Sequence, residues 1–118
     1  MLIQLNDDDR RKLNDAKTIL EKDLKSHITN QELAQKVGTN EFKLKHGFKQ
    51  LFNMTPFQFL TNVRLDKAKA MLEFTDYPIK KIAVEVGFRQ SANFTKRFKK
   101  SIGCSPLKWR SMSKRKIV

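Results

Sequence analysis

The sequence predicts an all-α fold of about seven helices, with two helix-turn-helix subdomains joined by a long linker helix. Apolar residues recur at helical spacing along most of the 118 residues, and no run of strict alternation is long enough to indicate a strand. The chain also repeats itself, since LAQKVG at residues 33–38 returns as IAVEVG at residues 82–87. Each copy is therefore expected to belong to a subdomain of its own.

The first helix is expected from about residue 8 to residue 25. Asn6 and the three aspartates after it offer N-cap oxygens and negative charge at the positive end of a helix. An apolar stripe at spacings of three and four follows, made of Leu13, Ala16, Leu20 and Leu24.

Two shorter helices complete the first unit. Thr29 and Glu32 have the spacing of a capping box, which predicts a helix that starts near residue 30 and stops at Gly38, where glycine tolerates positive φ. Asn40 is expected to cap the next helix, residues 41–52. The buried side of that helix is expected to carry Leu44, Phe48, Leu51 and Phe52.

The linker helix is expected to open with Thr55 and Pro56, a good cap and a residue tolerated at the first helical position, and to run to about Phe74. The second unit repeats the plan, with a helix from about Pro78, a turn at Gly87 and a helix over residues 91–102. Equivalent residues are 49 apart up to this turn and 50 apart after it, so the second turn contains one extra residue. An insertion confined to a turn is typical of duplicated helix-turn-helix units, because turns absorb length and packed helices do not.

These elements predict one domain over residues 1–118. It divides into a first helix-turn-helix subdomain (8–56), the linker helix (56–75) and a second helix-turn-helix subdomain (76–112). Each unit of about 50 residues would be marginally stable alone.

The charge indicates a polyanionic partner. Lys and Arg number 25 against 12 Asp and Glu, a net charge of +13, and residues 42–118 carry 18 basic but only 4 acidic side chains. Such a field attracts nucleic acid or an anionic membrane surface before any specific contact forms. Because no apolar run is long enough for a membrane span and the first residues lack a secretory pattern, we expect a protein of the cytoplasm, associated with the nucleoid, that does not bind a membrane.

Few residues offer catalytic or metal chemistry. Cys104 is the single cysteine and is expected to be a small buried thiol, and with His27 and His46 it makes no zinc-ligand spacing. An enzyme would need the acidic cluster at residues 7–9 to bind a catalytic metal, whereas a helix cap explains the same cluster. We therefore expect a protein that is not an enzyme and uses no cofactor or metal.

The second unit, IKKIAVEVGFRQSANFTKRFKKSIGCSPLKWR at residues 79–110, resembles the AraC/XylS family of bacterial transcription regulators. It has the family pattern I-x-x-I-A-x-x-V-G-F, then F-x-x-x-F-K-K, then G-x-S-P-x-x-W/Y-R, and RLDKAKAMLE at residues 64–73 is similar to the family's linker helix. The resemblance implies a homeodomain-like DNA-binding domain that regulates transcription, with activation as the expected outcome and RNA polymerase as a second partner. The chain is either a stand-alone regulator or, as its start favours, part of a longer chain with an effector-binding domain.

Helical projection selects the residues that face DNA, because the face opposite the buried stripe of each recognition helix must meet the bases. On the helix over residues 41–52, we expect base contacts from Phe42, Lys45 and His46. The alternatives are that Phe42 folds back over the turn and that His46 is a solvated surface residue. On the helix over residues 91–102, the expected base contacts are Ala92, Asn93, Thr95 and Lys96.

Further basic and polar residues are assigned to phosphates, with a solvated surface as the alternative for any one of them. They are Asn40, Lys43, Lys49, Lys80, Lys81, Arg89, Arg97 and Lys99, while Gly38 and Gly87 serve the two turns. Arg64 is expected to be structural, paired with Asp66 or Glu85, although a phosphate contact is an alternative. Five aromatic residues are expected to pack in a core or between the units, with stacking on nucleobases as the alternative, namely Phe57, Phe59, Tyr77, Phe88 and Trp109.

The expected function is sequence-specific binding of double-stranded DNA. The two recognition helices, residues 41–52 and 91–102, would enter successive major grooves about 34 Å apart, joined by a helix of roughly 27 Å. The alternative is a basic protein that binds nucleic acid without sequence preference, for which charge alone suffices.

Overall fold

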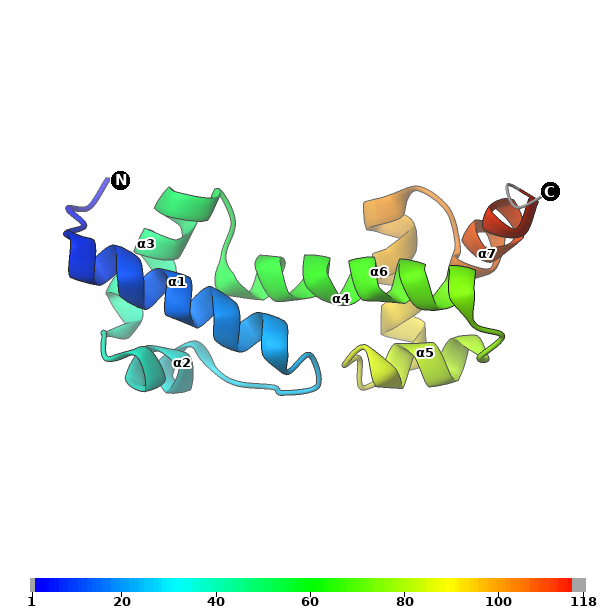
Figure 1. Cartoon of the computed structure of the whole chain (residues 1–118), viewed down its shortest axis with the longest axis horizontal. Coiled ribbons are helices and arrows are strands. Elements are labelled where there is room, and N and C mark those ends of the chain that lie inside the picture. The colour runs from blue at the N-terminus through cyan, green and yellow to red at the C-terminus, as the bar shows by residue number, and fades with distance from the viewer. Residues whose placement is uncertain (1, 116–118) are drawn as a thin grey trace. The chain divides into compact units, whose positions relative to one another are not determined.

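The computed structural model describes residues 2–115, with side chains to residue 113. The part described is all-α, as predicted, with seven helices and no strand (Figure 1). Two compact units, Met1–Asn62 and Val63–Val118, divide the chain within the fourth helix. The helices are α1 (Asp7–Lys22), α2 (Asn30–Val37), α3 (Glu41–Phe52), α4 (Pro56–Phe74), α5 (Ile79–Glu85), α6 (Ser91–Ile102) and α7 (Pro106–Arg115).

Helix α1 begins where the predicted cap places it. The Asn6 side chain accepts a hydrogen bond from the Asp9 backbone N–H, and the Asp9 side chain accepts one from the Asn6 backbone N–H, so a capping box opens the helix. The helix ends at Lys22 rather than at the predicted residue 25. Asp23 leaves the helical conformation, and Leu24 packs against the core from the turn that follows.

The caps of α2 and α3 are those that the sequence predicts. Thr29 and Glu32 bond each other's backbone N–H groups in a capping box at the start of α2. Gly38 ends that helix at φ 84°, a left-handed conformation that favours glycine. The Asn40 side chain then accepts the Lys43 backbone N–H at 2.7 Å and so caps α3.

Each unit has its own hydrophobic core. The first is built by α1, α2, α3 and the start of α4 from Leu13, Ala16, Leu20, Leu33, Ala34, Leu44, Phe48 and Leu60. The second is built by the remainder of α4, α5 and α6 from Leu65, Ala68, Leu72, Ile82, Ala83, Val86, Phe94 and Phe98, with Trp109 of α7 packed against it. The predicted buried side of α3 is therefore confirmed, with Leu44 and Phe48 in the core and Leu51 and Phe52 packed against it.

The turn and helix boundaries of the second unit also follow the prediction. Pro78 is the N-cap of α5, Gly87 takes φ 106° in the turn, and α6 covers Ser91–Ile102. The glycines of the two turns are 49 residues apart, while α3 and α6 start 50 apart, so the extra residue lies between Gly87 and Ser91.

Two aromatic residues expected to pack in the interior are exposed. Phe57 is 60% exposed, because Pro56 and Leu60 occupy the buried side of α4 in its first turn and the intervening position points outward. Tyr77 is 40% exposed, with the Lys81 ammonium 4.1 Å from its ring centroid. The thiol of Cys104, expected to be buried, is only half-buried in the turn between α6 and α7.

None of the helices in the described part of the chain combines the length and apolar character needed to cross a bilayer.

Candidate nucleic-acid interface

Helix α3 presents an aromatic pair on its outer face. Leu44, Gly47 and Phe48 of this helix are buried, and Phe42 is 52% exposed. The Phe42 ring lies 4.5 Å from the half-buried His46 ring, centroid to centroid, at an interplanar angle of 48°. Phe42 therefore contacts His46, one turn later in the same helix, and about half of its surface stays exposed.

The N-terminus of α3 is already engaged within the first unit. The Asn40 oxygen caps the helix, and the Lys43 ammonium lies 3.3 Å from a carboxylate oxygen of Asp9 in α1. Both residues were assigned to phosphates, and both have a partner in the protein. Lys45 and Lys49, by contrast, are exposed on α3.

Helix α6 presents a polar and basic face opposite its aromatic core. Phe94 and Phe98 are fully buried, whereas Ala92, Asn93 and Lys96 are exposed and Thr95 is half-buried. The Asn93 amide donates to the Gln90 side-chain oxygen at 3.3 Å, a long bond that keeps Asn93 beside the helix start. The side chain of Gln90, the N-cap, accepts no hydrogen bond from a backbone N–H of the first turn, so those N–H groups have no side-chain cap.

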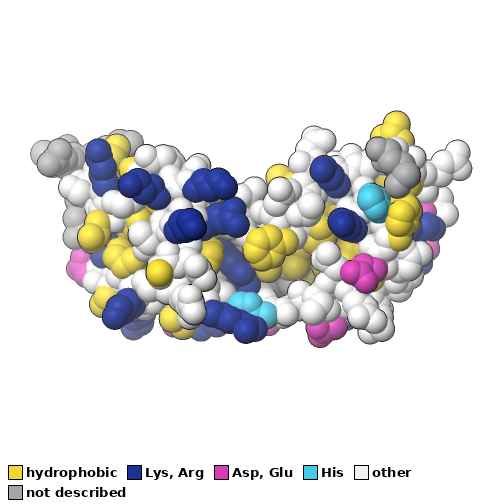
Figure 2. All heavy atoms as spheres, turned by 180° about the vertical axis from the view of Figure 1, so that it is seen from behind, with side chains coloured by type: hydrophobic (Ala, Val, Ile, Leu, Met, Phe, Trp, Pro, Cys, Tyr) yellow, Lys and Arg dark blue, Asp and Glu magenta, His cyan; other side chains and the backbone are white. Residues whose placement is uncertain are grey.

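Most of the net positive charge belongs to the second unit, which contains α6, and the first unit is nearly neutral. The second unit has 15 Lys and Arg against 4 Asp and Glu, whereas the first has 10 against 8. Figure 2 shows several Lys and Arg side chains gathered on one face of the second unit. The residues assigned to phosphates there are all exposed, namely Lys80, Lys81, Arg89, Arg97 and Lys99.

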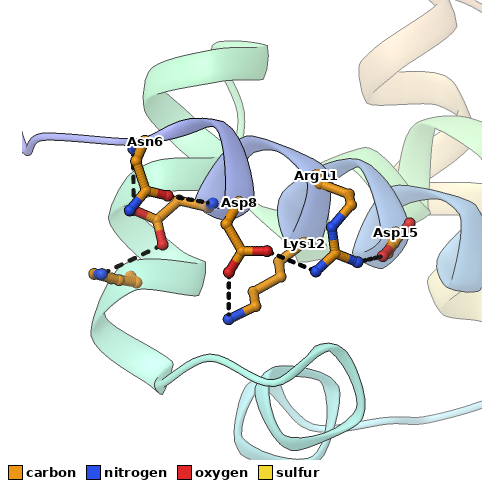
Figure 3. A network of polar contacts seen from close by, with 7 residues as sticks. Asn6, Asp8, Arg11, Lys12 and Asp15 are labelled. Atoms are coloured by element: carbon orange, nitrogen blue, oxygen red, sulfur yellow. Dashed lines mark hydrogen bonds and ion pairs between the residues drawn. The ribbon is translucent and has the colours of Figure 1, made fainter.

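Asp8, in the acidic cluster at the start of α1, forms ion pairs within its own helix (Figure 3). Asp8 lies 2.7 Å from the Arg11 guanidinium and 3.0 Å from the Lys12 ammonium, and Arg11 also reaches Asp15 at 3.3 Å. The hydrogen bond from Arg11 lowers the pKa of Asp8, and the same bond raises the pKa of Arg11. No group of three or more His, Cys, Asp or Glu that could bind a metal ion occurs among the residues described.

Arg64 is buried rather than placed at the surface. It is 5% exposed, and its guanidinium carbon lies 5.8 Å from the Phe88 ring centroid. Burial lowers the pKa of this guanidinium. The burial agrees with the structural role expected for Arg64.

A contact between α3 and the residues before α1 was not predicted from the sequence. The backbone of Ile3 exchanges two hydrogen bonds with the side-chain amide of Gln50, at 2.8 and 2.9 Å. A faint signal was present in the repeat, because α3 has Gly47 where the equivalent position of α6, 50 residues later, has Arg97.

Comparison with known proteins assigns the family. The model of the helix-turn-helix domain family matches residues 33–112. The transcriptional regulator ArgR of Pseudomonas aeruginosa is 30% identical over 95 residues, which cover 80% of this chain and 29% of that regulator. This chain thus spans less than a third of the length of that relative.

Two solved structures share the fold. The C-terminal domain of AraT, a response regulator from Geobacillus stearothermophilus, has a TM-score of 0.80 and 28% identity, covering 93% of this chain and 88% of that one. The DNA-binding domain of AdpA, a global transcriptional factor solved in complex with a target DNA, has a TM-score of 0.83 and 23% identity, covering 89% of this chain and 95% of that one. With a duplicated helix-turn-helix plan, two outward-facing polar helices and a family match over most of its length, the chain belongs to the AraC/XylS family of DNA-binding domains of transcription regulators.

Proposed function

We propose that this domain binds double-stranded DNA with sequence preference, through α3 and α6 in two successive major grooves. One observation carries the proposal: each of these helices buries one face in the core of its own unit and exposes polar, basic or aromatic side chains on the other. That division is the one a major-groove recognition helix needs, because the core face fixes the helix and the outer face meets base edges.

Helix α6 is assigned the polar base contacts. Asn93 has the donor and acceptor that pair with adenine N7 and N6, and the Ala92 methyl suits contact with a thymine methyl. Lys96 can donate to guanine O6 and N7, and Thr95 bonds either kind of base. The exposure of Ala92, Asn93 and Lys96 supports this assignment.

Helix α3 is assigned a more apolar contact. The half-exposed Phe42 ring suits thymine methyl groups, and its tilted contact with the His46 ring places the two side chains next to each other. Lys45, exposed on the same helix, is assigned to guanine.

The phosphate contacts are assigned mainly to the second unit. Its exposed basic residues, together with Lys49 of the first unit and the uncapped N–H groups of α6, position the domain on the duplex. Neutralising some 6–10 phosphates makes the affinity fall by roughly 10³–10⁵ between 50 and 200 mM salt. Asn40 and Lys43 contribute less, because both already bond within the first unit.

Activation of transcription and contact with RNA polymerase are proposed from family membership. An effector-binding domain is proposed on the same ground if the chain is part of a longer protein. Such a regulator acts on the nucleoid in the cytoplasm.

Selection of bound sequences from a random duplex pool tests the proposal. The expected result is one enriched site with two conserved segments about one helical turn apart. A basic protein without sequence preference is the competing function, supported by the net charge of +13. If random duplex displaces the domain from its selected site as well as the site itself does, that competing function is correct.

A further inference from the structure

The residues before α1 lie against recognition helix α3. Ile3 donates its backbone N–H to the Gln50 side-chain oxygen at 2.8 Å, and the Gln50 amide nitrogen donates to the Ile3 carbonyl at 2.9 Å. Both backbone groups of Ile3 and both polar atoms of the Gln50 amide are thus used in one reciprocal contact. This contact joins residues 47 positions apart in the chain, so it fixes the N-terminal segment (residues 2–6) relative to the second half of α3.

Gly47 makes room for the same segment in the middle of α3. A Cβ at this position would lie 2.9 Å from Leu13 Cδ1 and 3.3 Å from Leu5 Cδ2. Leu5, from the N-terminal segment, packs against the core of the first unit. Glycine inside a helix is less favourable than alanine, and here it allows two leucines to approach the α3 backbone.

A third contact joins the end of the segment to the start of α3. The carboxylate of Asp9, which is 8% exposed, accepts the Asn6 backbone N–H at 3.1 Å and the Lys43 ammonium at 3.3 Å. The α3 residues involved are therefore 43, 47 and 50, a spacing of four and three that defines one stripe of a helix. The stripe assigned to DNA, residues 42, 46 and 49, lies beside it, one residue or about 100° around the helix.

The duplicated helix shows what this stripe looks like without a covering segment. The positions of α6 equivalent to 43, 47 and 50 are Asn93, Arg97 and Lys100, and all three are exposed. Two of them are assigned to DNA. The two recognition helices thus differ in sequence at the α3 positions that contact the N-terminal segment and Asp9.

We propose that the N-terminal segment is a positioning element for α3, with Gln50 and Leu5 as the positioning residues, and that Asp9 of α1, which accepts the Asn6 backbone N–H of the segment, withholds Lys43 from phosphate. The segment leaves DNA contact on α3 to the face that carries Phe42, Lys45, His46 and Lys49. This inference rests on the proposed function, since it assumes that α3 contacts one segment of the DNA site.

The first test removes the reciprocal bonds without removing bulk. In the full chain, Gln50→Leu eliminates both hydrogen bonds, and Gln4→Leu is the matched control, since Gln4 belongs to the same segment and is exposed. Affinities are measured for the selected duplex and for duplexes changed by one base pair in either segment, well below the melting temperature of each variant. Gln50→Leu is expected to lose roughly tenfold discrimination, the value of one good base contact, in the α3 segment alone, and Gln4→Leu none.

A purely structural role of Gln50 gives a different result. Partial unfolding of the first unit lowers the active fraction, so all duplexes weaken by one factor and the order of base preference stays as in the unaltered chain. That outcome overturns the proposal. Amide hydrogen exchange supplies a readout without DNA, because Gln50→Leu is expected to accelerate exchange at Ile3, and an unchanged Ile3 rate also overturns it. If the unaltered chain selects no duplex while the Ile3 amide remains protected from exchange, the proposed DNA-binding function is wrong, although the Ile3–Gln50 contact is present.

The second test releases Lys43. Asp9→Asn keeps an oxygen for the Asn6 cap but removes the charge that pairs with Lys43, and Asp7→Asn removes the same charge from an exposed position on α1. A freed Lys43 adds one phosphate contact, so the salt slope of DNA binding is expected to steepen by about 1 in Asp9→Asn beyond any change in Asp7→Asn. Equal slopes in the two variants contradict the withholding of Lys43.

Discussion

Removing Arg110 is expected to destabilise the second unit more than removing any other basic residue of α7. Its guanidinium donates from α7 to three backbone carbonyls, that of Leu72 in the last turn of α4 at 3.1 Å and those of Thr75 at 3.2 Å and Tyr77 at 2.8 Å in the loop that follows α4. The last carbonyls of a helix have no partner within it, and α4 has no basic residue in its own last turn. Arg110 therefore supplies both the donors and the positive charge that this helix end requires.

The size of the effect follows from these contacts. A hydrogen bond to a charged group contributes about 1.5–3 kcal/mol. Arg110 is half-buried and its bond to Tyr77 is exposed, so each bond is discounted to about 1 kcal/mol for solvent screening. Arg110→Met is then expected to cost about 2–3 kcal/mol, which moves a urea midpoint by roughly 1–2 M for a unit of this size. Arg110→Lys is expected to cost less, because it keeps the charge and loses the planar fork.

Urea unfolding followed by tryptophan fluorescence measures this loss. Trp109 is the only tryptophan and packs against the core of the second unit, so its emission reports that unit. Lys108→Met is the matched control, since it removes one positive charge from an exposed position of the same helix. If Arg110→Met unfolds at the same urea concentration as Lys108→Met, the reasoning about the end of α4 is refuted.

Three further predictions concern the caps and cores. Thr29→Ala is expected to cost about 1 kcal/mol of unfolding free energy by breaking the capping box of α2, and a thermal melt that is unchanged would contradict this. Gly38→Ala is expected to cost about 1–2 kcal/mol because alanine must adopt the left-handed conformation; a Cβ there meets Lys12 Cε at an ordinary 3.7 Å, so crowding adds nothing, and equal urea midpoints for both proteins would exclude strain. Phe98→Ala is expected to cost about 3–5 kcal/mol and to unfold the second unit first, which would appear as loss of the Trp109 signal before loss of far-ultraviolet helicity; simultaneous loss of both signals would count against separate cores.

Local signals in the sequence were sufficient to locate most of the helices. The caps at Asn6, Thr29 and Asn40 mark three helix starts, because a side chain that bonds a backbone N–H three residues later leaves a short and specific pattern. The stripes of α3 and α6 identify the buried faces, and the faces opposite them follow by geometry. The outward face of α6 was therefore predictable before any coordinates.

Contacts between distant segments left no such pattern. Ile3 and Gln50 are 47 residues apart, and a backbone bond to a side-chain amide imposes no periodicity on either segment. The pairing of Lys43 with Asp9 depends on how α1 crosses α3, which sequence spacing does not define. The prediction that Phe57 packs was wrong for a related reason, since aromatic character alone does not decide which side of a helix faces the core.

Selection of bound duplexes with two single variants tests whether α3 and α6 contact separate segments of the DNA site. Phe42→Ala alters only α3 and Asn93→Ala only α6, and both positions are exposed, so neither change is expected to unfold the domain. Each variant is expected to lose base preference in one segment of the selected site, and the segment lost is expected to differ between the two variants. Loss of preference at the same base pairs in both variants, or in neither, would contradict the claim that two helices of one chain contact DNA separately.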